Sequence, residues 1–202
     1  MDSRIFEQAR GYALDRLERE LSPHLVYHGI GHTRDEVVPA AEMLAGMEDI
    51  RGEPLYLVLT AAWFHDIGHV KEALDHERIS VEIAAQVLPT FGYSEGEIRI
   101  IRGAILATAL PQSPQTPLEE ILVDADLDVL GRETFMQRNQ DLRCELYSFG
   151  KDFTDEQWYA NQLDFIQGHQ YFTASARVMR NRQKSLNIND LQNTLRELAK
   201  RQ

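Results

Sequence analysis

Apolar residues recur every three to four positions along most of the chain, the spacing that places them on one face of an α-helix. Similar patterns predict helices over residues 33–47, 54–66, 77–88, 94–109, 118–130, 133–148, 155–168 and 173–183, and a last one within 187–200. In the first helix, residues 3–21, the apolar face carries Ile5, Phe6, Ala9, Ala13, Leu14 and Leu17. No convincing alternating strand pattern, internal repeat or low-complexity segment is present, so the sequence predicts an all-α protein.

Proline, glycine and capping residues mark several of the helix ends. Pro54 fits the first turn of a helix, and Gly68 suggests an end or a bend near it. Ser94 and Glu97 have the spacing of a capping box. Three prolines in "LPQSPQTP", residues 110–117, predict a loop.

Length and composition fit a single domain spanning residues 1–202. The formal net charge is −11, from 21 basic and 32 acidic residues, which argues against an extended nucleic-acid or anionic-membrane surface. No apolar run approaches the roughly 18 residues of a membrane span, and the first residues lack the apolar core of a secretory signal. The single cysteine, Cys144, fits a reducing compartment. We therefore expect a cytoplasmic protein in which this thiol is a buried filler.

Ionisable side chains stand at the end of the most apolar segment, "LTAAWFHDIGHV", where His65 and Asp66 are adjacent. Neighbouring side chains on a helix diverge by about 100°, yet both can reach one metal ion that lies between them. An unpaired carboxylate buried in a helix costs several kcal/mol, and a shared cation would remove that cost. Other side chains of the same types occur in two further segments: His28 and His32 in "YHGIGHT", and Asp124, Asp126 and Asp128 in "ILVDADLDVLG".

The order His32, His65-Asp66, Asp126 resembles the H…HD…D signature of the HD-domain metal-dependent phosphohydrolases. The resemblance covers roughly residues 24–131. It implies a helical bundle of the HD-domain type with a metal site in the core cleft, on which the C-terminal helices of residues 132–202 pack. It also implies that these four residues ligate one divalent ion, of the Mn, Co, Ni, Fe, Zn or Mg type, and that Asp66 takes part in catalysis.

Further residues near these motifs could move a proton or complete a second metal site. His69 occupies a position where relatives carry a substrate-facing residue, and His28 resembles the proton-donating histidine of cyclic-nucleotide phosphodiesterases. Either could transfer the proton. His76 resembles the third histidine of two-metal relatives, but Thr108 stands near the place of their next histidine, which favours one metal.

Three residues that follow the metal helix are expected to contact the substrate: Lys71, His76 and Arg78. Within "DADLD", Asp126 corresponds to the family's ligand. Asp124 and Asp128 are therefore expected to support the ligands or to face solvent.

The reaction that the resemblance implies is release of phosphate from a small phosphorylated metabolite, with a nucleotide favoured by analogy with relatives. Two alternatives are a cyclic-nucleotide phosphodiesterase that uses His28 as its acid and a signalling module that binds metal and nucleotide without turnover. An oxygenase would require two irons, against which Thr108 counts. A homo-oligomer is possible.

Overall fold

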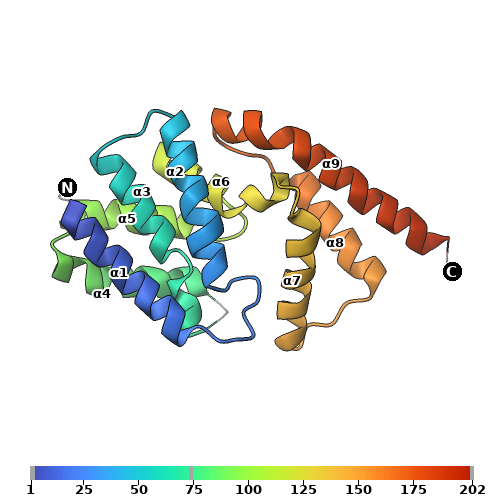
Figure 1. Ribbon diagram of the computed structural model, residues 1–202, viewed down its shortest axis with the longest axis horizontal. Helices are drawn as coiled ribbons and strands as arrows, with labels where there is room; N and C mark the ends of the chain where they lie inside the picture. The colour runs from blue at the N-terminus through green and yellow to red at the C-terminus, as the bar shows by residue number, and fades with distance from the viewer. Residues whose placement is uncertain (1–2, 73–74, 201–202) are drawn as a thin grey trace.

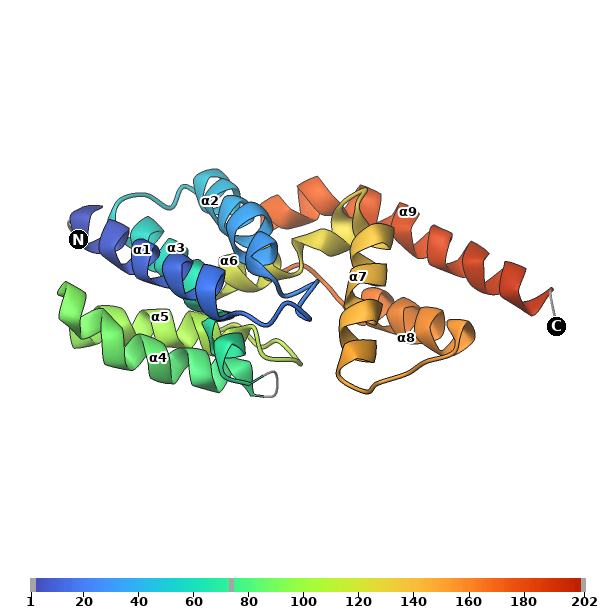
Figure 2. The same ribbon diagram turned by 60° about the horizontal axis from the view of Figure 1, so that its bottom comes forward.

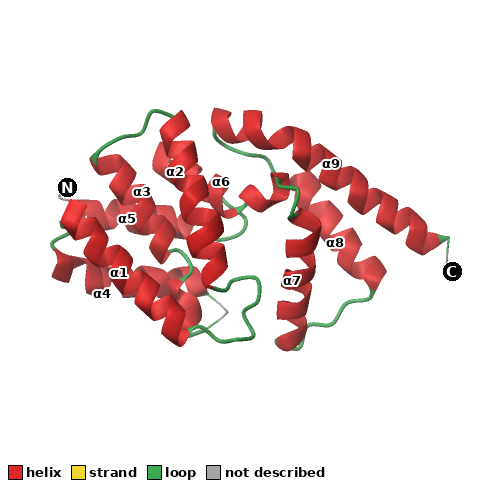
Figure 3. Ribbon diagram, in the orientation of Figure 1, coloured by secondary structure: helices red, strands yellow, loops and turns green. Residues whose placement is uncertain are grey.

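The computed structural model describes residues 3–72 and 75–200, and in these ranges it contains helices and no strand (Figure 3). The α-helices are α1 (Ser3–Glu20), α2 (Val38–Met47), α3 (Glu53–Phe64), α4 (His76–Phe91), α5 (Glu95–Ala107), α6 (Pro117–Asp126), α7 (Phe135–Ser148), α8 (Asp155–Gly168) and α9 (Ala174–Ala199). Three short helices connect them: the π-helix η1 (His32–Val37) and the 3-10 helices η2 (Ile67–Val70) and η3 (Asp128–Gly131). In these described residues, no helix is both long and apolar enough to cross a membrane.

The helices form two groups that lie side by side along the long axis of the molecule. Figures 1 and 2 both show α1–α6 at one end and α7–α9 at the other. A large apolar core fills the first group, and a smaller one, which includes Phe135, Ile166 and Leu191, fills the second. Whether the two groups fold together as one domain stays a prediction.

Helix α3 is the central element of the first group. Its residues from Leu57 to Phe64 are all buried, because α1, α2, α5 and α6 pack around it. Pro54 lies in its first turn, as the sequence predicts. The helix ends at Phe64, so His65 and Asp66 follow its last turn and are themselves buried.

The end or bend predicted near Gly68 is confirmed, since α3 ends at Phe64 and Gly68 lies in the following η2, and the glycine also has a packing role. A Cβ at this position would lie 2.0 Å from the carbonyl oxygen of His76, a distance that no side chain tolerates. The Gly68 amide also donates to Ser80 Oγ at 2.8 Å. The glycine therefore lets η2 approach the start of α4, which brings His69 next to His76.

Several predicted helix ends are confirmed and others are wrong. Ser94 and Glu97 form the capping box, and residues 110–117 lie outside the helices until Pro117. The helix predicted over residues 118–130 is interrupted at Leu127, between α6 and η3. The break predicted between residues 183 and 187 does not occur, since α9 is continuous. No proline or glycine interrupts that segment, and Asn187 uses its amide to hold the carbonyls of residues 130 and 132.

The expectation that Cys144 is buried is wrong, because its side chain is exposed. Phe135, Asn139 and Glu145 are the buried residues of α7, and Cys144 lies off the face that they define.

Candidate metal centre

Four side chains from three segments converge at the junction of α3, η1 and α6. They are His32, His65, Asp66 and Asp126, the ligands that the sequence predicts. His32 Nε2 lies 3.1 Å from Asp126 Oδ1 and 3.7 Å from Asp66 Oδ2. His65 Nε2 lies 3.3 Å from Asp66 Oδ2 and 3.5 Å from Asp126 Oδ1. Their ligand atoms therefore surround one small space, and their role as metal ligands stays a prediction.

Both histidine rings are held so that Nε2 faces this space. His65 Nδ1 donates to the carbonyl oxygen of Ala62 at 2.8 Å, and His32 Nδ1 lies 3.2 Å from Glu36 Oε2. Hydrogen bonds of this kind fix the tautomer of a metal-binding imidazole. Arg138 in turn holds Glu36, with Nε 3.0 Å from Oε1.

The convergent atoms fit a divalent ion. His65 Nε2 and Asp66 Oδ2 are fully buried and have no hydrogen-bond partner in the described structure. Buried polar atoms without partners are rare because each costs free energy. Two imidazole nitrogens and two carboxylates also form a donor set suited to transition ions and Mg²⁺.

Protons and carboxylates balance one another in the metal-free site. Burial lowers the pKa of His32, but hydrogen bonds to Asp126 and Glu36 outweigh it and raise that pKa to about 9. Burial raises the pKa of Asp126, and its contacts with His32 and His65 bring that pKa well below the usual range. The proton on each imidazole offsets a carboxylate charge that a metal would otherwise neutralise.

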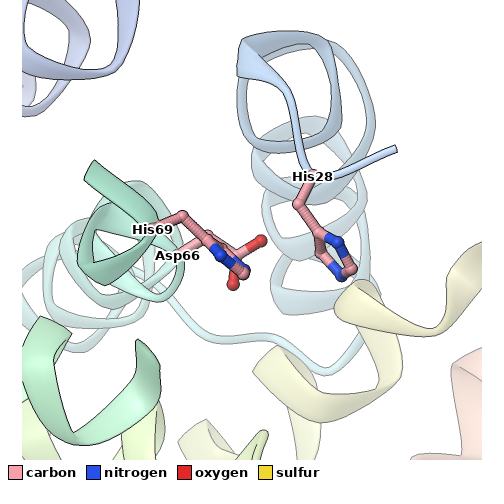
Figure 4. A group of neighbouring side chains, drawn as sticks. All are labelled: His28, Asp66 and His69. Carbon is pink, nitrogen blue, oxygen red and sulfur yellow. The ribbon is translucent and has the colours of Figure 1, made fainter. Parts of the chain in front are cut away.

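A second cluster of histidines borders the same aspartate. The rings of His69 and His76 stack with their centroids 3.9 Å apart, and His76 Nε2 lies 3.2 Å from Asp66 Oδ1. Figure 4 shows Asp66 and His69 extending from one side of the site and His28 from the other. Ligand atoms of His28, Asp66 and His69 lie within 4.8 Å of one another, close enough to hold an ion.

His69 is buried, and neither of its ring nitrogens has a hydrogen-bond partner in the described structure. Burial lowers its pKa to about 3, with further lowering from His28 and His76. The ring is therefore neutral near pH 7.

Glu145 holds one of these histidines in place, a contact that the sequence did not reveal. From α7 it accepts the backbone N–H groups of Tyr27 and His28 at 2.8 and 2.9 Å, and it lies 2.5 Å from His28 Nδ1. Its position on the buried face of α7 with Phe135 and Asn139 was the available signal, because a carboxylate on such a face needs a partner. The result is a fixed imidazole whose Nε2 makes no hydrogen bond to the residues that the structure describes.

Two cavities meet at the histidine cluster. One, of about 220 Å³, is bounded at the metal centre by His28, Asp66, His76 and Asp126 and extends between the two helix groups. The other, of about 470 Å³, has His28, His69 and His76 in its wall, with Lys151 beside them. A bound molecule could therefore reach the site from either side.

The remaining predicted residues divide into those near the site and those away from it. Lys71 is exposed and lines a small cavity with His69. Arg78 is exposed and pairs with Glu82 at 2.6 Å along α4, so the structure does not bring it to the site. Thr108 lies in the wall of the 220 Å³ cavity and donates its hydroxyl to the carbonyl of Ile105 at 2.8 Å.

The two neighbouring aspartates make structural contacts instead of facing solvent. Asp124 accepts the backbone N–H groups of Phe172 and Thr173 at 2.9 and 2.7 Å. Asp128 is buried and binds the guanidinium groups of Arg132 and Arg180. Both therefore tie the C-terminal helices to α6 and η3.

Comparison with known proteins agrees with this geometry. The sequence profile of the HD domain matches residues 28–128, half of the chain, so the chain belongs to the HD-domain family. The crystal structure of a predicted HD superfamily hydrolase from an uncultured Thermotogales bacterium is similar with a TM-score of 0.62, at 22% identity, over 93% of this chain and 91% of that one. No curated protein matches the chain. The family and the all-α fold that the sequence predicts are confirmed.

Proposed function

We propose that this HD-domain protein is a metal-dependent phosphohydrolase that releases phosphate from a small phosphorylated metabolite. Family membership supports this reaction class in general. The observation that carries it further is the pair of buried, unpartnered atoms, His65 Nε2 and Asp66 Oδ2, which face the same space as His32 and Asp126. A nucleotide is the substrate that we favour by analogy, and cytoplasm is the compartment that we expect.

A divalent ion at this centre would polarise a phosphoryl oxygen and lower the pKa of a water molecule. Asp66 presents its second oxygen, Oδ1, toward His76 and the cavity, where it can accept a proton from the attacking water. His28 also faces this cavity. Its Nδ1 is engaged by Glu145, so Nε2 is the atom that can pass a proton to the leaving oxygen.

The geometry favours His28 over His69 as the proton donor. A group with a pKa of about 3, such as His69, carries no proton to give at neutral pH, and a nearby cation would lower that pKa further. His28, by contrast, is held in place by the contact of its Nδ1 with Glu145 at 2.5 Å and lines the cavity. The same arrangement would serve a phosphodiesterase, which remains the alternative reaction.

The test is a screen of phosphorylated metabolites with added Mn²⁺ or Co²⁺. Wild-type protein should release phosphate from at least one compound, and Asp126→Asn should lose that activity while keeping its helical circular dichroism. Asp49→Asn is the matched control, because the Asp49 side chain is 95% exposed. Binding of a phosphorylated compound without turnover would instead support a non-catalytic signalling module.

A further inference from the structure

The 220 Å³ cavity has a chemically distinct end away from the metal centre. There its wall is formed mainly by apolar and aromatic side chains of η3, α7 and α8, including Leu130, Phe135 and Phe165. Asn139 and Gln162 contribute the amide groups of this wall. An apolar pocket with a few oriented polar groups is the usual form of a site for a small organic molecule.

A chain of hydrogen bonds fixes which way these amides point. Trp158 Nε1 donates to Asn139 Oδ1 at 2.6 Å, and an indole N–H can only donate. Asn139 must therefore present its oxygen to Trp158 and its Nδ2 to Gln162, whose Oε1 accepts at 2.6 Å. Trp158 and Asn139 are both buried, with 1% and 3% of their surface exposed. The indole N–H of Trp158, which can only donate, thus sets the orientation of both amides.

Gln162 lies in the cavity wall and has an amide nitrogen left over from this chain of hydrogen bonds. Its Oε1 is used by Asn139, and in the described residues no hydrogen bond engages its Nε2. This nitrogen has two N–H donors. A ligand in the cavity would meet a donor at this point and no acceptor.

The charged side chain at this end of the cavity, among the lining residues that the structure describes, is already paired. Arg138 lies in the wall, but its guanidinium pairs with Glu36 at 3.0 Å and with Asp141 at 2.9 Å and stacks over the ring of Tyr27 at 4.5 Å. The one cation is therefore already engaged, and neither of its two carboxylate partners lies in the cavity wall. A charged group on a ligand would find no counter-ion there, whereas an uncharged ring would be well accommodated.

We propose that this end of the cavity binds the organic part of the phosphorylated substrate, and that Gln162 Nε2 donates a hydrogen bond to it. The group that fits is flat and uncharged and carries an acceptor, either a carbonyl oxygen or an unprotonated ring nitrogen. Trp158 is the positioning residue, because it acts through Asn139 on the orientation of Gln162. This inference rests on the proposed function, since the metal centre must hold the phosphate at the other end.

Non-hydrolysable benzylphosphonates provide the test. Calorimetry on Mn²⁺-loaded protein would compare ortho, meta and para acetyl derivatives with isopropenyl derivatives, which have the same planar shape and lack the acceptor. At least one acetyl compound should bind about 2- to 10-fold more tightly than its isopropenyl counterpart, the usual effect of one neutral hydrogen bond. Gln162→Leu should abolish this preference. Gln167→Leu, the same change on an exposed position of α8, should keep it.

Trp158→Phe tests the positioning role separately from stability. Loss of the indole N–H frees Asn139 and Gln162 to reverse, so the acetyl preference should fall while the affinity for unsubstituted benzylphosphonate stays the same. The inference is overturned if no acetyl compound is preferred by the wild type, or if the preference survives in Gln162→Leu. If unsubstituted benzylphosphonate itself does not bind the metal-loaded protein, the proposed function fails, and the inference fails with it.

Discussion

At the scale of single residues, His28 and His69 are the two candidates for the proton donor, and their environments differ. His28 is held by Glu145, whereas His69 is buried without a hydrogen-bond partner in the described structure, with its pKa lowered to about 3. We expect His28→Ala to lower kcat by about 10²- to 10⁴-fold, the usual loss for a removed acid or base, and His69→Ala to lower it far less. Steady-state kinetics at saturating Mn²⁺ would measure both. A larger loss for His69→Ala would reverse the assignment.

The raised pKa of His32, about 9 in the metal-free site, predicts a proton linkage. Below pH 6.5 the protonated imidazole stabilises the fold fully, and this stabilisation is lost as the pH rises through 9. Because an imidazole must be unprotonated to ligate, Mn²⁺ binding at pH 7.5 should release about one to two protons from His32 and His65. Calorimetry in buffers of different ionisation enthalpy would count them. Binding without proton release would contradict the linkage.

The predicted ligands could be named from the sequence because His32, the His65-Asp66 pair and Asp126 stand in the order of the family signature that the sequence resembles. The residues that hold them could not. Glu145 reaches His28 from 117 positions away, and Arg138 reaches Glu36 from 102 positions away. No local pattern contains such a contact, which depends on how α7 docks against the first helix group.

At the scale of elements, the close approach of η2 to α4 controls the histidine cluster. Gly68→Ala would place a Cβ 2.0 Å from the carbonyl oxygen of His76, so the two elements must separate. Crowding of this kind costs about 1–3 kcal/mol, sometimes more, and urea denaturation would measure the loss. Gly11→Ala is the matched control: no atom lies within 4 Å of its Cβ position, and the change should stabilise α1 by about 0.5–1 kcal/mol.

The sequence predicted where most helices occur, but it did not predict where a helix is interrupted or continues. The apolar period and the capping box at Ser94 located most helices. The turn at Leu127 and the continuity of α9 depend instead on tertiary contacts. Asp128 joins Arg132 and Arg180, and Asn187 binds two carbonyls beside η3. These contacts accompany the end of α6 before Leu127 and the continuation of α9 through residues 183–187, where the sequence predicted a break.

At the scale of the whole molecule, the question is whether the two helix groups unfold together. The chain has two tryptophans: Trp63 is buried in α3 of the first group and Trp158 in α8 of the second. The contacts of Glu145 and Arg138 couple the groups, so we expect the single-tryptophan variants Trp63→Phe and Trp158→Phe to report one transition each. In each variant, the fluorescence and circular dichroism midpoints in urea should coincide. Separate midpoints within one variant would show two domains.

The central claim is that His32, His65, Asp66 and Asp126 hold a divalent metal ion. Elemental analysis of protein purified without chelator tests it most directly, with His65→Ala compared against His24→Ala, an exposed histidine outside the site. We predict close to one transition ion per chain in the wild type and in His24→Ala, and almost none in His65→Ala. Full metal occupancy in His65→Ala would contradict the account.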